Sequence, residues 1–557
     1  MAVVDVVWVD YRDDPDGTPS SGRGYWDQGM FEALFAGTLY PTSRRHTFRH
    51  WERRTWPADS RGGIVVFKGG NNADQLHTLT QDIAEHFPDW VLLITAGDEE
   101  DRVEWSRISH PNMVRWIALP RPESHRDCPD GTRYFGCGWP ADAPALLHPA
   151  DRTVAWSYAG QVNHSRRHEA VTAAAVLDVP GELHPSPGFT QGLGRADYYD
   201  LMARSKLVLC PSGPTTPDTF RMWEALEAGC VPIVDLKTPD DKVPGYYPFL
   251  LGGTPPFPTV DTWDTDLPDL VRNGLNDWPA NANRLWAWWQ QQKRRMAWAA
   301  VDDIAAMRGP DAAVVSEVTF LIATSPIPGH PDDGTLVETV ESIRAQQPDA
   351  EIIVMCDGVR AEQEHRRADY EDYLNRVLTR CAREWSGVVP VIFDELTQQA
   401  EMIRRTLPMV RTPFVMFVEH DTPLCGDIPW DPMKQVIADG EADMIRLYPN
   451  TDLEPSHLHM FHDRQTIHGV PLLRTHQYSS RPHLTSTAFM RRMLDTWFRP
   501  GEVMFLELRM HSVLSNLWAA DGILGWNQCR TWIYEPEGNL QRSLHSNGRA
   551  DDPAFPT

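Results

Sequence analysis

Residues 206–228 bring together the groups that could bind a diphosphate. The sequence predicts an apolar strand over 206–210 and an amphipathic helix over 219–228, and this segment carries five candidate residues, Ser212, Gly213, Thr215, Arg221 and Glu224. The N-terminus of a helix offers N–H groups and a positive dipole end to a phosphate. Arg221 could bind that phosphate through two hydrogen bonds, and Glu224, about one turn later, could accept hydrogen bonds from ribose hydroxyls. The alternative is an ordinary ion pair on the helix face.

A second group of acidic residues stands at the ends of two later strands. Asp357 follows a strand expected over 351–356, where a nucleotide base or ribose could lie. Glu419 and Asp421 stand at the end of the strand 414–418, so their carboxylates can converge on one cation. Mg²⁺ or Mn²⁺ is commonly held by one or two carboxylates and a substrate diphosphate, whose developing charge it neutralises. We expect such a cation here, and the alternative is an acidic cluster without a metal.

Short apolar strands that alternate with helical segments must position both groups. This alternation is typical of α/β layers with mostly parallel sheets. The expected strands are 3–9, 63–67, 90–95, 153–159, 206–210, 231–234, 318–324, 351–356, 388–393 and 414–418, and the alternation breaks down beyond them. A long Trp-rich helix over 281–308 ends before Gly309-Pro310, which marks the main domain boundary. The sequence therefore predicts domains at 1–150, 151–310 and 311–557.

The block over 197–234 resembles the exostosin-like glycosyltransferases. The motif that carries the resemblance is a Pro-Ser-Gly loop after a strand, followed by Arg-Met-Trp-Glu-Ala-Leu-Glu-Ala-Gly-Cys-Val-Pro-Ile-Val at 221–234. The resemblance implies a GT-B architecture for residues 1–310, with two facing Rossmann-like lobes and the nucleotide sugar in the second lobe. Gly160 and the following pair Arg166-Arg167 resemble the glycine loop and the basic residue of that family. For this pair the alternative is an ordinary position on the surface.

The later strands and Glu-His-Asp at 419–421 resemble a GT-A glycosyltransferase, in which Asp-x-Asp holds the metal. The resemblance implies that both carboxylates of this motif are metal ligands and that His545 supplies a further one. Glu507 resembles the general base that deprotonates the acceptor hydroxyl in inverting enzymes. The alternatives are a salt bridge between Glu507 and Arg509 or Arg542, and an exposed tail histidine at 545.

Charge and cysteine content limit the partners and the compartment. The 557 residues carry a formal net charge of −25, so the surface repels polyanions at long range and any contact with nucleic acid needs a local basic patch. The eight Cys include no Cys-x-x-Cys pair, which favours reduced thiols and disfavours structural zinc. The start lacks a basic leader, and no stretch reaches the roughly 18 apolar residues of a membrane span. We therefore expect a soluble cytoplasmic protein, bacterial or phage-encoded.

A basic and aromatic segment near the N-terminus could contact an acceptor made of nucleic acid. Phe48 and Trp51 are interleaved with five arginines that could follow phosphates while the rings stack on bases, Arg44, Arg45, Arg49, Arg53 and Arg54. The alternatives are salt bridges within an acidic protein and binding of sugar or donor phosphates. Asp27, at the head of an expected helix, is either a general base that faces the cleft or a helix N-cap.

Together these observations predict a bifunctional glycosyltransferase that uses nucleotide-diphosphate-sugar donors. The N-terminal half would work without a metal and the C-terminal half with Mn²⁺ or Mg²⁺. The acceptor could be a cytoplasmic glycan precursor, a small molecule, a protein, or hydroxymethylated DNA as for a bacteriophage DNA glycosyltransferase. The alternative from another class is a carbohydrate- or nucleic-acid-binding protein with one or both modules inactive. Without a Gly-x-Gly-x-x-Gly after a strand, an NAD-dependent dehydrogenase is disfavoured.

Overall fold

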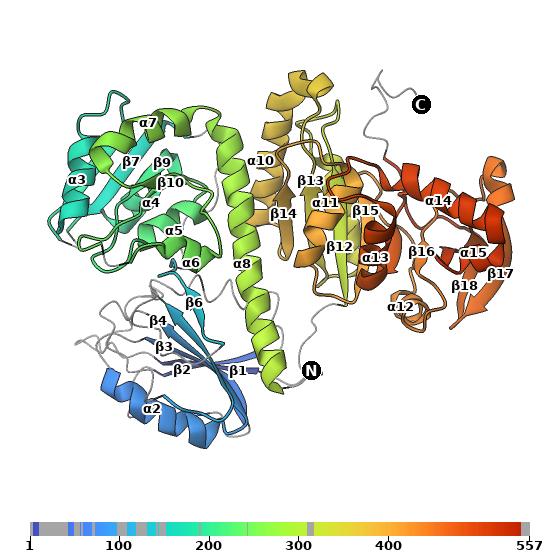
Figure 1. Ribbon diagram of the computed structural model, residues 1–557, viewed down its shortest axis with the longest axis horizontal. Coiled ribbons are helices and arrows are strands. Elements are labelled where there is room, and N and C mark those ends of the chain that lie inside the picture. Colours follow the sequence, from blue (N-terminus) through green and yellow to red (C-terminus); the bar gives the residue numbers. More distant parts are fainter. Residues whose placement is uncertain are drawn as a thin grey trace. The chain divides into compact units, whose positions relative to one another are not determined.

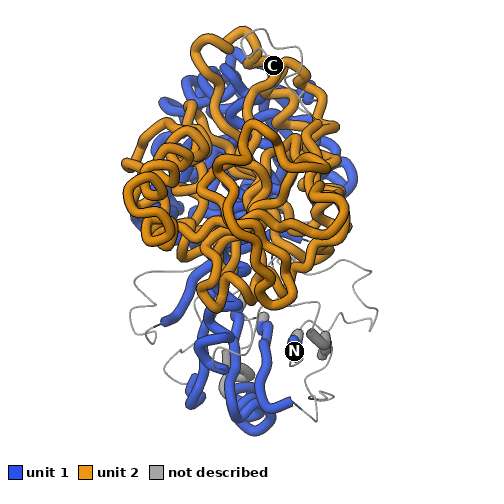
Figure 2. The backbone as a smooth tube through the Cα atoms, turned by 90° about the vertical axis from the view of Figure 1, so that its right-hand side faces the viewer, with its two compact units in different colours: residues 1–313 blue, residues 314–557 orange. Residues whose placement is uncertain are grey.

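The computed structural model divides the chain into two units, Met1–Ala313 and Val314–Thr557 (Figure 2). The structure describes residues 4–9, 30, 43–48, 56, 60–68, 73–96, 108–118, 131–140, 143, 152–188, 191–241, 243–308 and 317–546. The predicted general base Asp27 and the patch residues Arg49, Arg53 and Arg54 lie outside the described residues, and so do the side chains of Arg44 and Arg45.

The first unit begins with a six-stranded parallel sheet in the order β2-β1-β3-β4-β5-β6. Its strands are β1 (Val4–Val9), β2 (Ser43–Phe48), β3 (Gly62–Lys68), β4 (Trp90–Ala96), β5 (Met113–Ala118) and β6 (Arg133–Phe135). Successive side chains of a strand point to opposite faces. Ile64 and Val66 therefore enter one apolar core, and Val65 and Phe67 enter the other, which helix α2 (Ala73–His86) covers.

A second parallel sheet follows, with five strands in the order β11-β10-β9-β7-β8. Its strands are β7 (Val154–Gln161), β8 (Glu182–Ser186), β9 (Ser205–Cys210), β10 (Val231–Asp235) and β11 (Thr259–Val260). The helices between them are α3 (Ser165–Ala174), α4 (Arg195–Arg204), α5 (Phe220–Glu227), α6 (Tyr246–Leu251) and α7 (Trp263–Leu275). Because β7 and β9 are parallel neighbours, the end of β7 and the loop before α5 lie at the same edge of the sheet.

Helix α8 (Trp278–Arg308) packs on both sheets of the first unit (Figure 1). In its middle, Trp289 contacts the rings of Trp139 and Trp223, with centroids 5.1 and 5.2 Å apart. Near its end, Asp303 Oδ2 accepts hydrogen bonds from Trp116 Nε1 at 2.8 Å and from Arg133 Nε at 2.6 Å. This acid therefore ties the end of α8 to β5 and β6.

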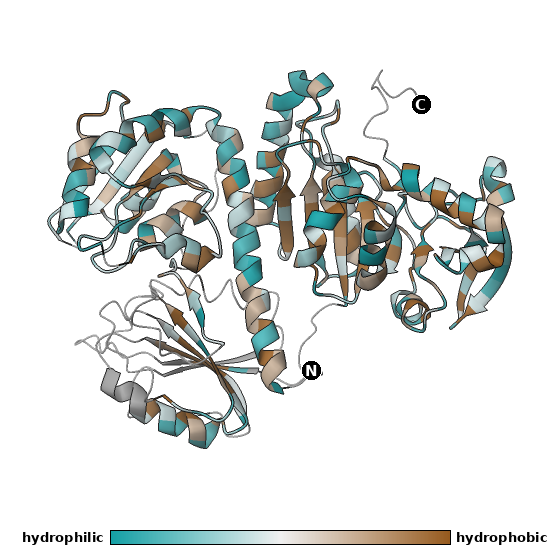
Figure 3. Ribbon diagram, viewed as in Figure 1, coloured by the Kyte–Doolittle hydropathy of each residue, from teal (hydrophilic) through white to brown (hydrophobic). Residues whose placement is uncertain are grey.

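The second unit contains a nine-stranded sheet in the order β14-β13-β12-β15-β19-β16-β20-β18-β17. Its strands are β12 (Val318–Thr324), β13 (Glu351–Cys356), β14 (Val388–Ile392), β15 (Phe414–Glu419), β16 (Met444–Arg446), β17 (Phe461–Ile467), β18 (Val470–Thr475), β19 (His483–Ser486) and β20 (Thr531–Tyr534). The first four are parallel, and β12 is buried along its whole length, as expected for a strand covered on both faces. Figure 3 shows apolar residues along these strands.

Helices cover this sheet on both sides. They are α9 (Gly334–Gln346), α10 (Arg367–Arg383), α11 (Gln398–Thr406), α12 (Trp430–Ala438), α13 (Thr487–Trp497), α14 (Leu506–Asp521) and α15 (Ile523–Trp526), with short 3₁₀ turns at Ala361–Arg366, Leu407–Met409 and Pro455–Met460. The two faces belong to separate apolar cores, one with Phe320 and Ile322 and the other with Leu321 and Ala323.

The predicted α/β class with mostly parallel sheets is confirmed, and the strands expected at 318–324 and 351–356 coincide with β12 and β13. The edge strand β2 was not among the strands expected from the sequence. Residues 43–48, which include Arg44 and Arg45 of the predicted basic patch, form this strand. Beyond β15 the loss of alternation reflects a mixed extension in which β19 runs antiparallel to both β15 and β16. Among the described residues, no helix has the length and apolarity needed to span a bilayer.

Replacing Asp303 should destabilise the first unit. Asp303→Ala leaves the buried indole N–H of Trp116 and the guanidinium of Arg133 without their acceptor, so we expect the free energy of unfolding to fall by about 2 kcal/mol. Denaturant unfolding of the full chain measures this loss. Asp302→Ala, at the exposed neighbouring position, is the matched control, and an equal loss in both variants would contradict a specific role for Asp303.

Candidate functional site

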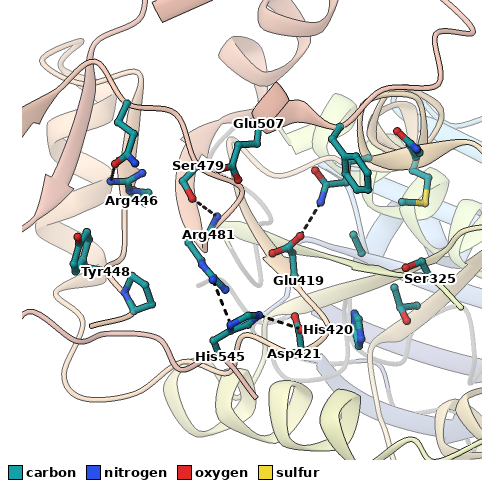
Figure 4. A pocket seen from close by; sticks show the side chains of 18 of the residues that line it. Ser325, Glu419, His420, Asp421, Arg446, Tyr448, Ser479, Arg481, Glu507 and His545 are labelled. Atoms are coloured by element: carbon teal, nitrogen blue, oxygen red, sulfur yellow. Dashed lines mark hydrogen bonds and ion pairs between the residues drawn. The ribbon is translucent and has the colours of Figure 1, made fainter. Parts of the chain in front are cut away.

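A cavity of about 770 Å³ opens at the carboxyl ends of β12, β13 and β15 (Figure 4). Ser325 follows β12, Asp357 follows β13 and Asp421 follows β15. These strands are parallel neighbours, so the loops after them meet at one edge of the sheet, where ligands of open α/β sheets bind. Arg446, at the end of β16, and Glu507, in the first turn of α14, also line the cavity.

The C-terminal segment holds Asp421 in the wall of this cavity. Ser546 N donates to the Asp421 carbonyl at 2.9 Å, in a stretch where residues 542–546 run beside the loop after β15. This pairing brings His545 Nε2 to 3.5 Å from Asp421 Oδ2, and Arg481 Nη2 lies 3.4 Å from the other ring nitrogen of His545. Asp421 and His545, predicted as metal ligands from distant parts of the sequence, are therefore neighbours.

Asp421 is buried, with 8% of its surface exposed. Burial alone raises its pKa, but the hydrogen bond with His545 and the charges of His420 and His545 outweigh burial and lower the pKa well below its ordinary value. The carboxylate is therefore ionised at neutral pH and can bind a cation.

A polar network connects Glu419 to the opposite wall. Gln399 Nε2 donates to Glu419 Oε1 at 2.8 Å, and Ser480 Oγ donates to Gln399 Oε1 at 3.1 Å. The backbone N–H of Ser480 donates to Glu507 Oε2 at 3.0 Å. Gln399 and Ser480 were not singled out from the sequence, since neither belongs to a motif, and the only signal was the position of Gln399 at the start of a helix near a strand end.

Glu507 does not form either of the salt bridges weighed from the sequence. Arg509 pairs instead with Glu502, and Arg542 donates to backbone carbonyls, including that of Asp427 at 3.0 Å. Glu507 lines the cavity with one hydrogen bond from a backbone N–H. This carboxylate can thus face a hydroxyl group in the cavity.

The Asp357 carboxylate forms its hydrogen bonds with neighbouring backbone N–H groups. Its carboxylate accepts hydrogen bonds from the N–H groups of Gly358 at 2.9 Å, Thr397 at 2.7 Å and Gln398 at 3.1 Å. Burial raises the pKa of Asp357, and these hydrogen bonds oppose that rise. Asp357 therefore fixes the turn before α11, which carries Gln399, and lines the cavity at the same time.

The residues near Asp421 fit a divalent cation only if the substrate completes its shell. Among the described parts of the chain, no group of three or more His, Cys, Asp or Glu side chains is gathered as a metal site. Asp421 and His545 offer two donor atoms 3.5 Å apart, close to the roughly 3 Å between adjacent ligands of an octahedral Mg²⁺. Glu419 is the last residue of β15, two positions before Asp421, but one of its oxygens accepts a hydrogen bond from Gln399.

In the first unit, Arg221 lies across the end of β7. Its Nε donates to the Ala159 carbonyl at 2.9 Å, and its guanidinium carbon is 4.7 Å from the centre of the Tyr158 ring. A Cβ on Gly160 would lie 2.0 Å from Arg221 Nη2, so a glycine is required for this position of the arginine. Arg221 Nη1 is buried and has no hydrogen-bond partner, so neither of its two N–H groups is used within the protein.

Glu224 does not pair with Arg221. Its two carboxylate oxygens accept hydrogen bonds from the hydroxyls of Tyr198 at 2.6 Å and Tyr199 at 3.1 Å. Burial raises the pKa of Glu224, and the two tyrosines oppose that rise. The ion pair weighed as an alternative is therefore absent between these two residues, and both tyrosines were missed because they lie in a different helix, α4.

The Arg166 side chain forms ion pairs with acidic residues of the protein. Its Nε lies 3.1 Å from Asp235 Oδ2, and its Nη1 lies 2.7 Å from Glu169 Oε2. These contacts argue against the predicted contact with the donor, since a guanidinium that neutralises a buried acid cannot leave it without cost. The neighbouring Arg167 faces the candidate loop instead, and its Nε donates to the Ser212 carbonyl at 3.2 Å.

Hydrogen bonds fix the conformation of the loop before α5. Gly213 N donates to the Thr216 carbonyl at 2.9 Å, and Ser212 is fully buried with a hydroxyl that has no hydrogen-bond partner. Asp218 accepts from the backbone N–H of Cys137 at 2.8 Å and from Tyr246 OH at 2.7 Å, which ties the loop to the segment after β6. Thr215 is partly exposed beside them.

Residues 190–306 match the family model described as the RXYLT1 C-terminal domain. The match runs from the segment before α4 into α8, covers about a fifth of the chain and contains the loop with Ser212 as well as Arg221 and Glu224. The predicted enzyme class, a glycosyltransferase, is therefore confirmed. No curated protein matches the chain.

Three solved structures are similar to part of the chain. TarS from S. aureus has 14% identity and a TM-score of 0.27 over 42% of this chain and 37% of that chain. The bifunctional IspDF from Campylobacter jejuni has 14% identity and a TM-score of 0.23 over 41% and 52%. The mannosyltransferase PcManGT from Pyrobaculum calidifontis, in complex with GDP-Man and Mn²⁺, has 12% identity and a TM-score of 0.25 over 40% and 55%. The chain thus spans 37% to 55% of the length of these structures.

Acid should reveal the lowered pKa of Asp421. An acid whose pKa is depressed by folding adds stability above its ordinary pKa of 3.8, and this stability is lost as the pH falls below that value. Between about pH 6 and pH 3, we expect the wild type to lose about 1 kcal/mol more unfolding free energy than Asp421→Asn. Denaturant unfolding across this range measures the difference, and parallel pH profiles would contradict the assignment.

Proposed function

We propose that this chain is a glycosyltransferase with nucleotide-diphosphate-sugar donors and that its second unit is a GT-A module. The observation that carries the proposal is the cavity at the carboxyl ends of β12, β13 and β15, in which the Asp421–His545 pair faces Glu507 across the network of Gln399 and Ser480. A charged donor, a cation site and a candidate base can be accommodated in one open cavity.

Each wall of the cavity has a separate role in this proposal. The nucleoside lies beside Ser325 and Asp357, and the diphosphate lies beside Asp421, His545 and Arg481. When bound there, Mn²⁺ or Mg²⁺ would neutralise the charge that develops on the leaving diphosphate. Glu507 accepts the proton of the acceptor hydroxyl, and the N–H of Ser480 keeps its carboxylate oriented.

For the first unit, we propose that residues 151–308 form the donor lobe of a GT-B module. The family-model match over 190–306 supports this, and so do the buried Ser212 hydroxyl and the Arg221 Nη1 without partners. Buried polar groups are normally hydrogen-bonded, and a ligand phosphate would satisfy both. The sheet formed by β1–β6 would be the other lobe. Two active modules would make the enzyme bifunctional.

The first unit's role can be tested at Gly160. The Cβ of Gly160→Ala displaces the end of the Arg221 side chain, and the backbone φ of +154° at this position adds strain, so we expect the free energy of unfolding to fall by about 1–3 kcal/mol. Binding of a nucleoside diphosphate to this unit should fall at least about tenfold, as in Arg221→Gln. Calorimetric titration in the Asp421→Asn background isolates this site. Gly252→Ala, where φ is also positive (+71°) but a Cβ meets nothing within 4 Å, is the control for strain alone. Unchanged binding in Gly160→Ala and Arg221→Gln would refute the donor lobe.

The second unit's role can be tested at Asp421. With a panel of nucleotide sugars, we expect Asp421→Asn to lower the release of nucleoside diphosphate by at least about tenfold for the donor whose turnover EDTA abolishes. Asp427→Asn, an exposed acid on the same loop, should retain turnover. Turnover that survives in Asp421→Asn would argue against this module.

The same panel separates the remaining alternatives. Nucleotide binding without turnover of any donor would favour a binding protein with inactive modules. Turnover stimulated by hydroxymethylcytosine DNA would favour a DNA glycosyltransferase.

A further inference from the structure

One wall of the second unit's cavity contains a buried cation without a carboxylate partner. Arg446 is 4% exposed and lines the cavity. Its Nη2 donates to Gln477 Oε1 at 2.9 Å, whereas its Nε has no hydrogen-bond partner (Figure 4). No carboxylate of residues 317–546 forms an ion pair with it, although other arginines of this unit have such partners, for example Arg474 with Asp463 at 2.5 Å.

A guanidinium buried in this position lowers the stability of the folded protein unless a ligand supplies an anionic partner. Burial lowers the pKa of Arg446 to about 10, so the group is still charged at neutral pH. Burying a charge without a partner costs several kcal/mol in general, and an unpaired buried N–H adds to that cost. An anion that enters the cavity would remove both costs, since the guanidinium can bind a carboxylate or phosphate through two parallel hydrogen bonds.

The order of the strands places Arg446 on the acceptor side. β15 and β16 both run antiparallel to β19, so their carboxyl ends lie at the same edge, separated by two strand spacings of about 5 Å each. Asp357 lies two strands from β15 in the other direction, after β13. A nucleoside diphosphate that reaches from Asp357 to Asp421 therefore ends about 10 Å before Arg446.

We propose that Arg446 binds a compact anion, a phosphate or a carboxylate, on the acceptor sugar and so selects anionic acceptors. This inference rests on the proposed function of the second unit. Arg481, whose Nη1 is buried without a partner, provides a second guanidinium between Arg446 and His545. A buried anion site suits a phosphorylated or acidic sugar better than a nucleic-acid backbone, which needs an exposed basic track.

Direct binding tests the anion site. The probes are a methyl hexoside, its 6-phosphate and the corresponding methyl hexuronide, titrated calorimetrically into the full chain with nucleoside diphosphate present. We expect at least one anionic probe to bind about tenfold or more tighter than the neutral one. Arg446→Gln should abolish this preference and Arg446→Lys should retain part of it, because lysine keeps the charge but loses the planar fork. Arg464→Gln, at an arginine that pairs with Glu535 outside this cavity, should keep the full preference.

The outcomes distinguish this inference from the proposed function. Equal binding of neutral and anionic probes by the wild type, or a preference that survives in Arg446→Gln, overturns the anion site even if donors are turned over. An Arg446-dependent preference without donor turnover supports the site and refutes the transferase. Tighter binding of a hydroxymethylcytosine oligonucleotide than of either sugar anion overturns the sugar assignment. If Arg446→Gln does not fold, the anion site is tested with Arg446→Lys and with inorganic phosphate as a competitor of the anionic probe in the wild type. A lack of competition by phosphate overturns the site.

Discussion

The cavity of the second unit depends on one main-chain pairing between segments far apart in the sequence. The Ser546 N–H bonded to the Asp421 carbonyl fixes the C-terminal segment against the loop after β15. Without that pairing, Asp421 would lose His545, and only His420 would remain of the two histidines that lower its pKa against the effect of burial. The charge that could hold a cation is therefore a property of the folded chain, since a carboxylate is kept ionised in a buried site only by nearby positive groups.

Other buried carboxylates also lie beside positive or hydrogen-bond-donating groups, but these carboxylates stabilise the fold. Asp235 is matched by Arg166, Asp303 by Arg133 and Trp116, and Asp218 by donors from both sides of the first unit. Each of these carboxylates joins elements that are distant in sequence, and both oxygens of each accept hydrogen bonds from groups of the protein. Such groups stabilise the arrangement of the loops but leave little for a ligand.

Both candidate sites contain buried polar atoms that have no hydrogen-bond partner within the protein. Arg221 Nη1 and the Ser212 hydroxyl in the first unit, and Arg446 Nε in the second, are buried without partners. Most buried polar groups in folded proteins are hydrogen-bonded, because an unpaired one costs free energy. All three atoms belong to residues at or after the carboxyl end of a strand or on the helix that follows, which is where α/β sheets bind ligands.

The sequence by itself determined the α/β class, the strands β12 and β13, and the position of Asp357, Glu419 and Asp421 after strand ends. This was possible because strands buried on both faces must be continuously apolar, and that pattern is local. Tertiary structure alone decided the partner of each polar group. Arg166 pairs with Asp235, Glu224 accepts hydrogen bonds from two tyrosines of α4, and Gln399 with Ser480 links Glu419 to Glu507. These contacts depend on strand order and on which loops meet at one edge, and no local periodicity encodes either.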